Sequence, residues 1–269
     1  CNSKFKKINN YVYKCIYCSF FKSKLKSGHG RDIEGISELR RKNFKKIINI
    51  ILSFNVNQNF KILEIGSGNG FFIEECNKLN IDITGSEADD EQYSILKKKF
   101  LNIIKIALPL KKFDNDMLNK FDYVILNDVF EHIENLDLTT NQLKRFLKNN
   151  GKIIINLPSS GGLIYKFSSI LDKIGISTFY DRLWQKNLSS PHLSYFNNQN
   201  LKLFFKRYNF DLVYSDSLDT VSDKGNFKRL NSTIKNKFIC VVLSGILFFY
   251  YYLQKILPSD IILHFYKKN

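Results

Sequence analysis

Residues 61–71 constrain the fold of this chain more than any other stretch. They read Lys61-Ile62-Leu63-Glu64-Ile65-Gly66-Ser67-Gly68-Asn69-Gly70-Phe71. The apolar run at 62–65 favours a buried parallel strand. The glycines at 66, 68 and 70 let the backbone turn sharply and leave room for a ligand to lie against it. A helical spacing of apolar residues begins at Phe71, so the stretch predicts the strand, turn and helix that open a nucleotide-binding βαβ unit.

Strands and helices alternate along the rest of the chain. We expect strands at 81–87, 103–107, 121–127, 151–158, 210–215 and 261–265, and helices at 36–54, 89–100, 138–148, 198–207 and 238–253. Further apolar and basic helices are expected within 162–190, and the polar stretch 216–230 is expected to be mobile. This alternation predicts an α/β fold built on a Rossmann-like doubly wound sheet.

The N-terminal residues carry a possible metal site. Cys15 and Cys18 have the Cys-x-x-Cys spacing of a zinc knuckle, and Cys1 precedes them by about the length of a β-hairpin. Residues 1–21 are therefore interpreted as part of a zinc-ribbon-like hairpin, with free thiols as the alternative. Because the chain starts at Cys1 rather than Met, a fourth ligand would lie upstream in a longer protein.

Two further segments complete the expected organisation. Residues 22–55 form a polar connector and an N-terminal helix, and residues 56–269 form the main domain, in which 160–256 includes variable helices on the substrate side. Five cysteines, an odd number, argue for reduced thiols rather than a disulfide framework. No secretory signal precedes the first strand, so a cytoplasmic location is expected.

Charge and hydropathy allow several partners. The net charge of +16 permits an anionic partner, but the lysines are spread along the chain, so nucleic acid is the less favoured partner. Residues 238–253 carry no charge and are too few to reach the ~20 residues that cross a bilayer. They are expected to form either a core helix or an interfacial helix that contacts a membrane surface.

The glycine loop favours one class of cofactor. A dinucleotide fingerprint would need a third glycine at 71, where this chain has Phe71, and Glu64 would sit poorly beside a diphosphate. S-adenosylmethionine carries an ammonium and a sulfonium and no phosphate, so it suits Glu64 better. Glu87 ends the second strand about twenty residues past the first glycine, where an acid receives ribose hydroxyls.

Five segments together resemble one family, the class I S-adenosylmethionine-dependent methyltransferases. They are 62–70, 85–87, 121–124, 128–133 and 147–152. Glu131-His132 resembles the subgroup of ubiquinone-biosynthesis and sugar or cell-surface-polysaccharide O-methyltransferases, and the cysteine ribbon and residues 190–196 are similar to its bacterial members. The resemblance implies a seven-stranded, mostly parallel sheet whose last strand, at 261–265, is antiparallel, with a small N-terminal hairpin.

The resemblance also implies which residues hold S-adenosylmethionine. The loop holds the methionine part, Glu87 holds the ribose hydroxyls, Ala88 flanks the adenine, and Asn127 lies where the methyl group points. The cofactor-binding residues expected are Glu64, Gly66, Ser67, Gly68, Gly70, Glu87, Ala88 and Asn127.

Candidate catalytic residues follow the fourth strand. His132 is the best candidate for a general base, because its pKa suits neutral pH, with Glu131 as a second base or a loop anchor. His192 could reach the substrate from its loop. Alternatively Asp128, Glu131 and His132 bind Mg²⁺ or another divalent ion that lowers the pKa of a substrate hydroxyl.

These residues lead to a functional expectation. The chain is expected to O-methylate a small molecule such as a sugar, a cell-surface polysaccharide precursor or a quinol. An RNA-modifying methyltransferase or an RNA-binding protein is the alternative, and RNA co-purification with a steep salt dependence would distinguish it.

Overall fold

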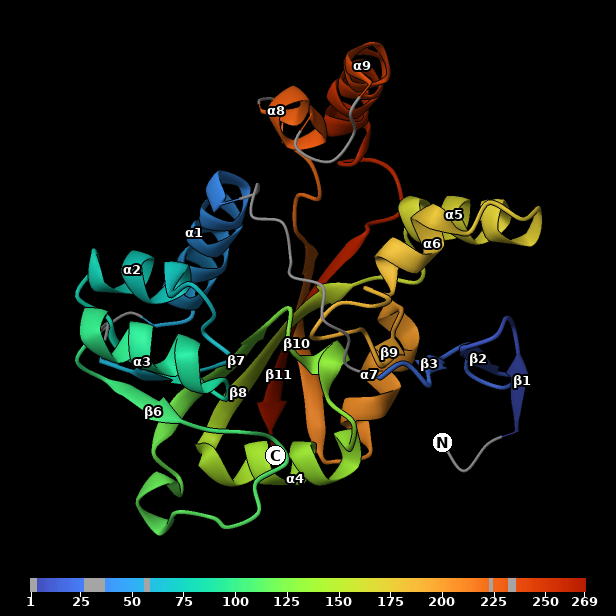
Figure 1. The fold of residues 1–269 in the computed structure, drawn as a ribbon. Helices are drawn as coiled ribbons and strands as arrows, with labels where there is room; N and C mark the ends of the chain where they lie inside the picture. Colours follow the sequence, from blue (N-terminus) through green and yellow to red (C-terminus); the bar gives the residue numbers. More distant parts are fainter. Residues whose placement is uncertain (1–3, 27–36, 56–58, 223–224, 232–235) are drawn as a thin grey trace.

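A computed structural model describes residues 4–26, 37–55, 59–222, 225–231 and 236–269. Within these ranges the chain forms one sheet of seven strands and a smaller sheet of four strands (Figure 1).

The seven-stranded sheet has the expected topology. In sheet order its strands are β10 (Phe210–Ser217), β11 (Ile261–Lys268), β8 (Leu147–Pro158), β7 (Phe121–Asn127), β4 (Lys61–Ile65), β5 (Asp82–Glu87) and β6 (Ile103–Lys105). Neighbouring strands are parallel from β8 to β6, and only β11 runs antiparallel, to β8 on one side and to β10 on the other. The prediction of a doubly wound, mostly parallel sheet with an antiparallel last strand is confirmed. Strand β8 begins earlier than expected because Leu147 already pairs with Phe121.

Helices cover both faces of this sheet because successive strand residues point to opposite sides. Ile62, Tyr123 and Ile154 belong to the core under α1 (Ser37–Ser53), α2 (Phe71–Asn77) and α3 (Asp90–Lys99). Leu63 and Val124 belong to the other core, under α4 (Leu136–Phe146) and α7 (Asn198–Lys206). Since both faces are covered, apolar residues of the central strands point to both sides of the sheet, and Glu64, Asn127 and Asn156 are buried polar exceptions near the strand ends.

Short polar side chains fix where three of these helices begin. Asp89, Asn135 and Asn197 each accept a hydrogen bond from the backbone N–H three residues further on, at the starts of α3, α4 and α7. Such N-caps satisfy an otherwise unpaired donor and stabilise a helix by about 1 kcal/mol. They keep the strand-to-helix turns at the edge of the sheet short and defined.

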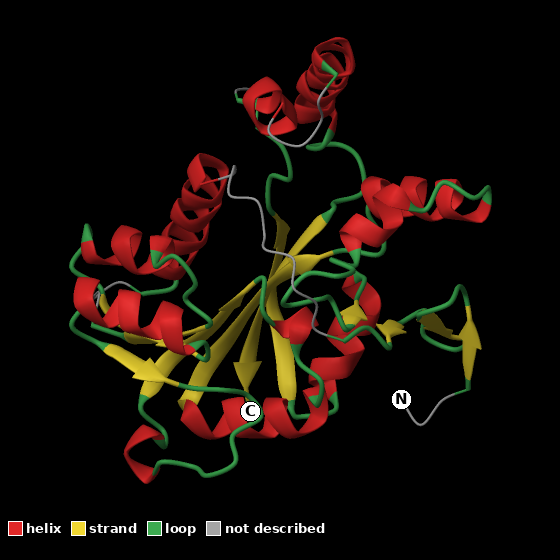
Figure 2. Cartoon of the chain, viewed as in Figure 1, coloured by secondary structure: helices red, strands yellow, loops and turns green. Residues whose placement is uncertain are grey.

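The smaller sheet joins the N-terminus to a distant loop (Figure 2). Its strands, all antiparallel, are β1 (Phe5–Lys7), β2 (Val12–Cys15), β3 (Phe21–Ser23) and β9 (Ser194–Tyr195). A third core lies beneath it, on α5 (Leu163–Lys173) and α6 (Thr178–Leu183). This core consists of Val12, Tyr165, Tyr180, Trp184 and Tyr195.

The cysteines of the predicted zinc ribbon lie at the end of this hairpin. Cys15 ends β2 and is buried, and Cys18 is half-buried in the turn that leads to β3. Burial raises the pKa of the Cys18 thiol. Cys1 lies outside the described residues, so zinc binding by Cys1, Cys15 and Cys18 stays a prediction.

The apolar segment 238–253 was expected to form either a core helix or an interfacial helix, and the structure excludes the first of these. The segment forms α9 (Lys237–Leu253), preceded by the short helix α8 (Asn226–Asn231), which itself lies in the stretch expected to be mobile. Only Cys240 of α9 is buried, so the interpretation of 238–253 as a core helix is wrong. None of the helices in the described ranges is both long enough and apolar enough to cross a bilayer.

Candidate active site

The candidate site residues lie at the edge of the sheet where the parallel strands end. Glu64 is the second-last residue of β4, and Glu87 and Asn127 are the last residues of β5 and β7. Ligands of open α/β sheets bind at this edge, because the loops that leave neighbouring strands open a crevice there.

A buried chain of hydrogen bonds holds Glu64. The Asn127 Nδ2 donates to Glu64 Oε1 over 2.9 Å, and the Asn156 Nδ2 donates to Asn127 Oδ1 over 2.6 Å. Burial, with the negative charge of Glu87 adding to it, raises the pKa of Glu64 to about 8. Glu64 Oε2 is also buried and lacks a hydrogen bond of ordinary geometry among the described residues, and the Asn127 amide and Ser67 hydroxyl lower the pKa of this carboxyl only in part against its burial. An unsatisfied buried carboxylate oxygen is costly, so a cationic or hydrogen-donating ligand group would stabilise this arrangement.

The three glycines of the loop are required for different reasons. All have positive φ, at 69° for Gly66, 50° for Gly68 and 75° for Gly70. A Cβ on Gly66 would lie 2.7 Å from Val129, and one on Gly70 would lie 2.5 Å from Phe100, whereas a Cβ on Gly68 would meet nothing within 4 Å. Gly66 and Gly70 are therefore required by packing. Gly68 faces open space, as expected for backbone that a ligand approaches.

Substitution with alanine should separate these two roles. Gly70→Ala forces a methyl group into Phe100 at a left-handed position and should destabilise the fold by about 2–4 kcal/mol. Gly68→Ala should cost only about 1–2 kcal/mol of stability. Its methyl group enters the open space, so it should weaken cofactor binding at least tenfold. Urea unfolding and calorimetric titration measure the two effects; equal destabilisation by both variants would contradict the assignment.

Glu87 is pre-oriented by the backbone around it. Its Oε2 accepts the Gly68 N–H over 3.0 Å, and its Oε1 accepts the Ala88 N–H over 2.8 Å. The Gln92 Nε2 donates to the Gly68 carbonyl over 2.6 Å, so both sides of this glycine are fixed. The Ser67 Oγ accepts the Ser86 N–H over 3.2 Å, so this side chain links the glycine loop to β5. The carboxylate of Glu87 keeps lone pairs for ligand hydroxyls.

The segment after β7 turns through a strained residue. Asp128 has φ 52°, in the left-handed region, and its N–H donates to Asn156 O over 3.2 Å. The one-turn 3₁₀ helix η2 (Phe130–His132) follows directly. Burial raises the pKa of Asp128, against the opposing charges of Arg40 and His132. Strain of this kind persists where surrounding structure enforces it, and it commonly marks functional sites.

The loop that carries His192 is tied to η2 and to the N-terminal hairpin. The Leu193 N–H donates to Glu131 O over 2.8 Å. On its other side, the Ser23 N–H donates to Leu193 O over 2.9 Å, and the Ser23 Oγ donates to His192 O over 2.8 Å. The hairpin thus fixes a loop almost 170 residues away in sequence, with His192 held against Glu131.

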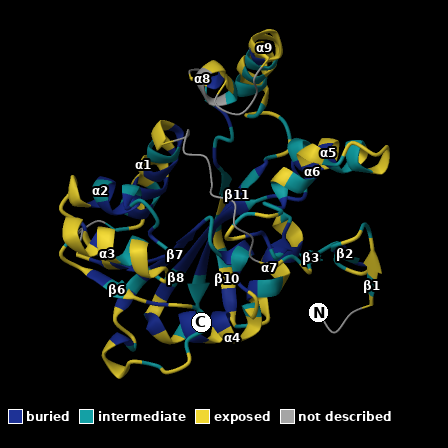
Figure 3. Ribbon diagram, viewed as in Figure 1, coloured by how far each residue is buried: buried dark blue, intermediate teal, exposed yellow. Residues whose placement is uncertain are grey.

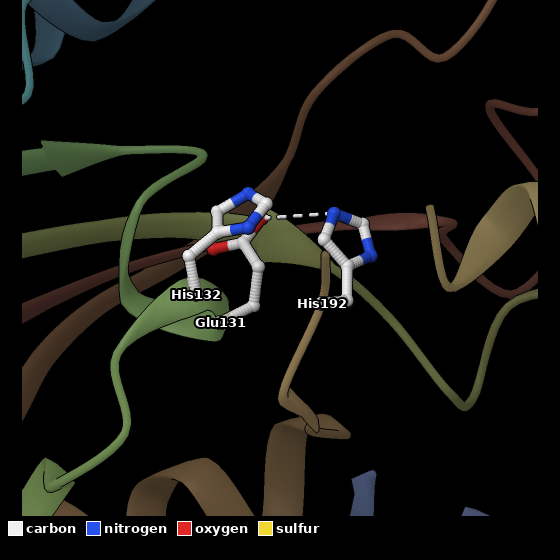
Figure 4. A group of neighbouring side chains, drawn as sticks. All are labelled: Glu131, His132 and His192. Carbon is white, nitrogen blue, oxygen red and sulfur yellow. Dashed lines mark ion pairs between the residues drawn. The ribbon is translucent and has the colours of Figure 1, made fainter. Parts of the chain in front are cut away.

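Glu131, His132 and His192 form one compact cluster (Figure 4). One ligand atom from each side chain lies within 4.8 Å of the others, and His192 Nε2 is 3.9 Å from Glu131 Oε1. Both carboxylate oxygens of Glu131 are buried without a hydrogen bond from the described residues. Burial and the charge of Asp128 raise the pKa of Glu131 well above its usual value. The cluster therefore contains acceptor atoms that need a cation or a donor.

The tautomer of His192 follows from its contact with Tyr195. His192 Nδ1 lies 3.2 Å from Tyr195 Oη, whose proton is donated to Leu183 O over 2.8 Å, so Nδ1 donates to the tyrosine. His192 Nε2 then carries the lone pair toward Glu131. Burial, with the charge of His132, lowers the pKa of His192 to about 3. His192 is accordingly neutral, and its contact with Glu131 is not a salt bridge.

The structure groups the predicted residues differently from the sequence. The predicted magnesium ligands were Asp128, Glu131 and His132, but the side chain that joins Glu131 and His132 in the compact group is His192. Asp128 acts on Glu131 through its charge. The sequence analysis did not identify Asn156, which orients Asn127, or Tyr195, which contacts His192. Asn156 interrupts the apolar run of β8, which is the signal that could have identified it, and Tyr195 lies three residues after His192.

The chain is similar to known proteins in sequence and in fold. A family model described as a methyltransferase domain matches residues 34–215. The ubiquinone biosynthesis O-methyltransferase of Pelagibacter ubique is 26% identical over 140 residues, which are 48% of this chain and 56% of that protein. Its mitochondrial counterpart from Rattus norvegicus is 25% identical over 142 residues, or 49% of this chain and 41% of that protein. The chain thus spans about half the length of the curated relatives it matches.

Solved structures match more of the chain. A SAM-dependent methyltransferase from Archaeoglobus fulgidus superposes with a TM-score of 0.54 at 17% identity, covering 87% of this chain and 97% of that one. A SAM-dependent methyltransferase from Methanosarcina mazei gives a TM-score of 0.54 at 11% identity, covering 81% and 96%. At these identities the similarity establishes the fold.

Proposed function

The chain belongs to the S-adenosylmethionine-dependent methyltransferases, and we propose that it methylates an oxygen of a small molecule such as a sugar, a cell-surface polysaccharide precursor or a quinol. The observation that carries the proposal is the cluster of Glu131, His132 and His192 beside the cofactor edge. A base or a metal ion that takes or loosens the proton of the acceptor accelerates methyl transfer to a hydroxyl more than transfer to a neutral amine, because the amine is already nucleophilic. The O-methyltransferase names of the two ubiquinone-biosynthesis relatives support the same acceptor atom.

Residues along β4 and β5 suit S-adenosylmethionine. The unsatisfied Glu64 Oε2 suits the α-ammonium of the methionine part, and the open space at Gly68 suits the close approach of the ligand to the backbone. Glu87 suits the ribose hydroxyls, with Ala88 beside the adenine. Asn127 orients Glu64 and ends β7, directly before the segment that carries Glu131 and His132.

Methyl transfer from a sulfonium needs little chemical help from the protein. The cofactor supplies an activated methyl group and a good leaving group, and the reaction is an in-line displacement. The chain's own contribution is to align the acceptor and exclude water, and positioning of this kind can contribute ~7–11 kcal/mol.

His132 is the proposed general base. Its Nδ1 donates to Pro191 O over 3.0 Å, which assigns the lone pair of the neutral ring to Nε2. A positioned base typically contributes ~10²–10⁴-fold. His192, with a pKa of about 3, is a poor base at neutral pH but is neutral and so competent as a metal ligand.

As the alternative to His132 acting as a base, the same cluster fits a divalent cation. Glu131 would supply a carboxylate and His132 and His192 would supply imidazoles, with small closing movements, because the ligand atoms now lie within 4.8 Å of one another. Two imidazoles favour Mn²⁺, Co²⁺, Fe²⁺ or Zn²⁺ over the Mg²⁺ first expected. Bound there, such an ion would lower the pKa of an acceptor hydroxyl.

Tyr195→Phe should weaken metal binding without altering cofactor binding. The variant loses the partner of His192 Nδ1, and loss of such a partner typically costs 10–100-fold in metal affinity. It also loses the hydrogen bond from the Tyr195 hydroxyl to Leu183 O, so the free energy of unfolding should fall by about 1–2 kcal/mol. Calorimetric titrations with Mn²⁺ and with S-adenosylmethionine give the two affinities; an unchanged Mn²⁺ affinity would refute this positioning role.

Labelled methyl transfer tests the proposed reaction. The chain is incubated with S-adenosylmethionine labelled in its methyl group and with separate panels of sugar nucleotides, quinols and RNA. We expect label in a sugar or quinol as a methyl ether, which survives mild alkali, and no label in RNA. Label in nuclease-sensitive material, or only as an alkali-labile ester, would overturn the proposal.

A further inference from the structure

We propose that α9 docks the protein on an anionic membrane surface, with the outer half of the helix lying among the lipid headgroups. Figure 3 shows α9 and α5 projecting beyond the sheet with much of their surface exposed. Surface helices normally turn a charged face to water and an apolar face to the core. In α9 the face turned to water is apolar instead.

Beyond Lys237 at its first position, the solvent-facing half of α9 carries no charged side chain. Phe238 is 76% exposed, Val241 59% and Phe249 70%. The exposed positions recur so that they fill a continuous half of the helix. They are Phe238, Ile239, Val241, Val242, Gly245, Ile246, Phe248, Phe249, Tyr252 and Leu253. A contiguous apolar surface of this extent marks an interaction site.

The charge around the helix selects anionic lipid as the occupant. From Gly225 to Pro258 the sequence contains four lysines and one arginine and neither Asp nor Glu. Lys237 and Lys255 stand at the two ends of α9, and both are exposed. Basic residues beside an apolar helical face are the pattern of helices that lie in the membrane interface, and each contributes about 1 kcal/mol near anionic lipid.

The length and the aromatic end of α9 also fit a helix that lies on a membrane. Its 17 residues span about 25 Å, which is short of the hydrocarbon thickness. Tyr250, Tyr251 and Tyr252 follow two phenylalanines and precede Lys255. Tyrosines are enriched at headgroup level, where the ring is apolar and the hydroxyl stays wet.

A buried carboxylate ties this helix to the catalytic edge. Asp260 accepts a hydrogen bond from the Tyr250 hydroxyl on α9, and its Oδ1 accepts the Ile164 N–H at the start of α5 over 2.8 Å. Ile261 follows at once and pairs with Pro158, the last residue of β8. The docking helix is thereby held at the edge of the sheet where the site lies.

Helix α5 supplies a second apolar ridge at the same edge. Phe167 is 61% exposed and Ile170 57%, and Ile174 just beyond the helix is 67% exposed. The acidic residues nearby are engaged by the N-terminal hairpin: Asp172 accepts from Asn9 over 3.1 Å, and Asp181 accepts from Tyr11.

Flotation with lipid vesicles tests the docking surface. The chain is mixed with vesicles of phosphatidylcholine alone and of phosphatidylcholine with 30 mol% phosphatidylglycerol. We expect it to float with the anionic vesicles. The double variant Ile246→Glu, Phe249→Glu should lose at least tenfold in partitioning. Leu101→Glu, a control at a 94% exposed position outside α9, should bind as the original chain does.

Lysine substitutions and oligomeric state sharpen the test. Lys237→Gln and Lys255→Gln should each lower binding to anionic vesicles roughly fivefold and leave binding to neutral vesicles unchanged. Thermal unfolding confirms that each variant is folded. A chain that stays unbound, or a double variant that binds as well as the original, would overturn the proposal. So would a soluble dimer that the double variant dissociates, which would assign the face to a second copy. Vesicle binding is read without methyl transfer, so the outcome is independent of the proposed acceptor.

Discussion

Replacing Glu64 with glutamine will weaken S-adenosylmethionine binding about 100- to 1,000-fold. The glutamine keeps the size of the side chain and an oxygen that can accept from Asn127, but it removes the charge opposite the ligand ammonium. Loss of one partner of a buried, hydrogen-bonded charge pair costs about 2–5 kcal/mol. Calorimetric titration of the two proteins at the same pH gives the affinity ratio directly.

Two controls show whether the loss arises at the ammonium. Methylthioadenosine lacks the amino-acid part of the cofactor, so its affinity should be the same for Glu64→Gln and the original chain. Asp82→Asn removes an exposed carboxylate at the opposite end of β5 and should leave both affinities unchanged. Parallel losses for both ligands would mean that glutamine distorts the site and that the charge assignment is wrong.

Cofactor binding should also release a proton below neutral pH. With a pKa of about 8, Glu64 is protonated at pH 6.5 in the free chain, whereas the paired form is the carboxylate. Binding at pH 6.5 should therefore release close to one proton, and affinity should fall up to tenfold for each pH unit below 8. Calorimetry in buffers of different ionisation enthalpy measures the release, and Glu64→Gln should show none.

Replacing Glu131 will abolish the stabilisation of the fold by a bound metal ion and most of the methyl transfer. Glu131→Gln should lower Mn²⁺ affinity at least 100-fold and reduce kcat by ~10²–10⁴-fold. Because both oxygens of Glu131 are unsatisfied and buried, the metal-free variant should unfold at the same temperature as the original chain or at a higher one. The original chain alone should then gain about 2.7 kcal/mol of stability at Mn²⁺ concentrations near 100 times Kd.

The neighbouring Glu134 provides a matched control for this prediction. Its side chain is exposed three residues away, so Glu134→Gln should keep both the metal response and the transfer rate. Mn²⁺ is the probe because zinc could also bind Cys15 and Cys18. Transfer that is undiminished in chelator, together with no stabilisation by Mn²⁺, would eliminate the metal and leave His132 as a base acting alone.

The sheet and the cofactor loop could be predicted because their signals are local. Apolar strand runs, closely spaced glycines and the acid Glu87 are all visible within about 30 residues of sequence. Within the seven-stranded sheet, the antiparallel direction of β11 was predicted from the family resemblance, since nothing in 261–265 itself encodes strand direction.

The acceptor-side cluster could be predicted only in part. Asp128, Glu131 and His132 lie within five consecutive residues, so they were grouped together. The contact of His192 with Glu131 depends on β9 pairing with the N-terminal hairpin, and tertiary pairing of a two-residue strand leaves no periodic pattern.

Helix α9 shows a different limit of sequence analysis. An uncharged run of this length is compatible with a buried helix or an exposed interfacial one, because hydropathy records composition and not which element covers the helix. The contacts of α9 with the rest of the chain decide the matter, and these bury only Cys240.

A crystal structure of the chain with S-adenosylhomocysteine tests the account most directly, through the distance between Glu64 Oε2 and the ligand amino nitrogen. We predict a hydrogen bond of about 2.7–3.2 Å, with the ribose hydroxyls on Glu87 and the sulfur toward Asn127. A ligand bound elsewhere, or a Glu64 Oε2 still without a partner in the complex, would contradict it.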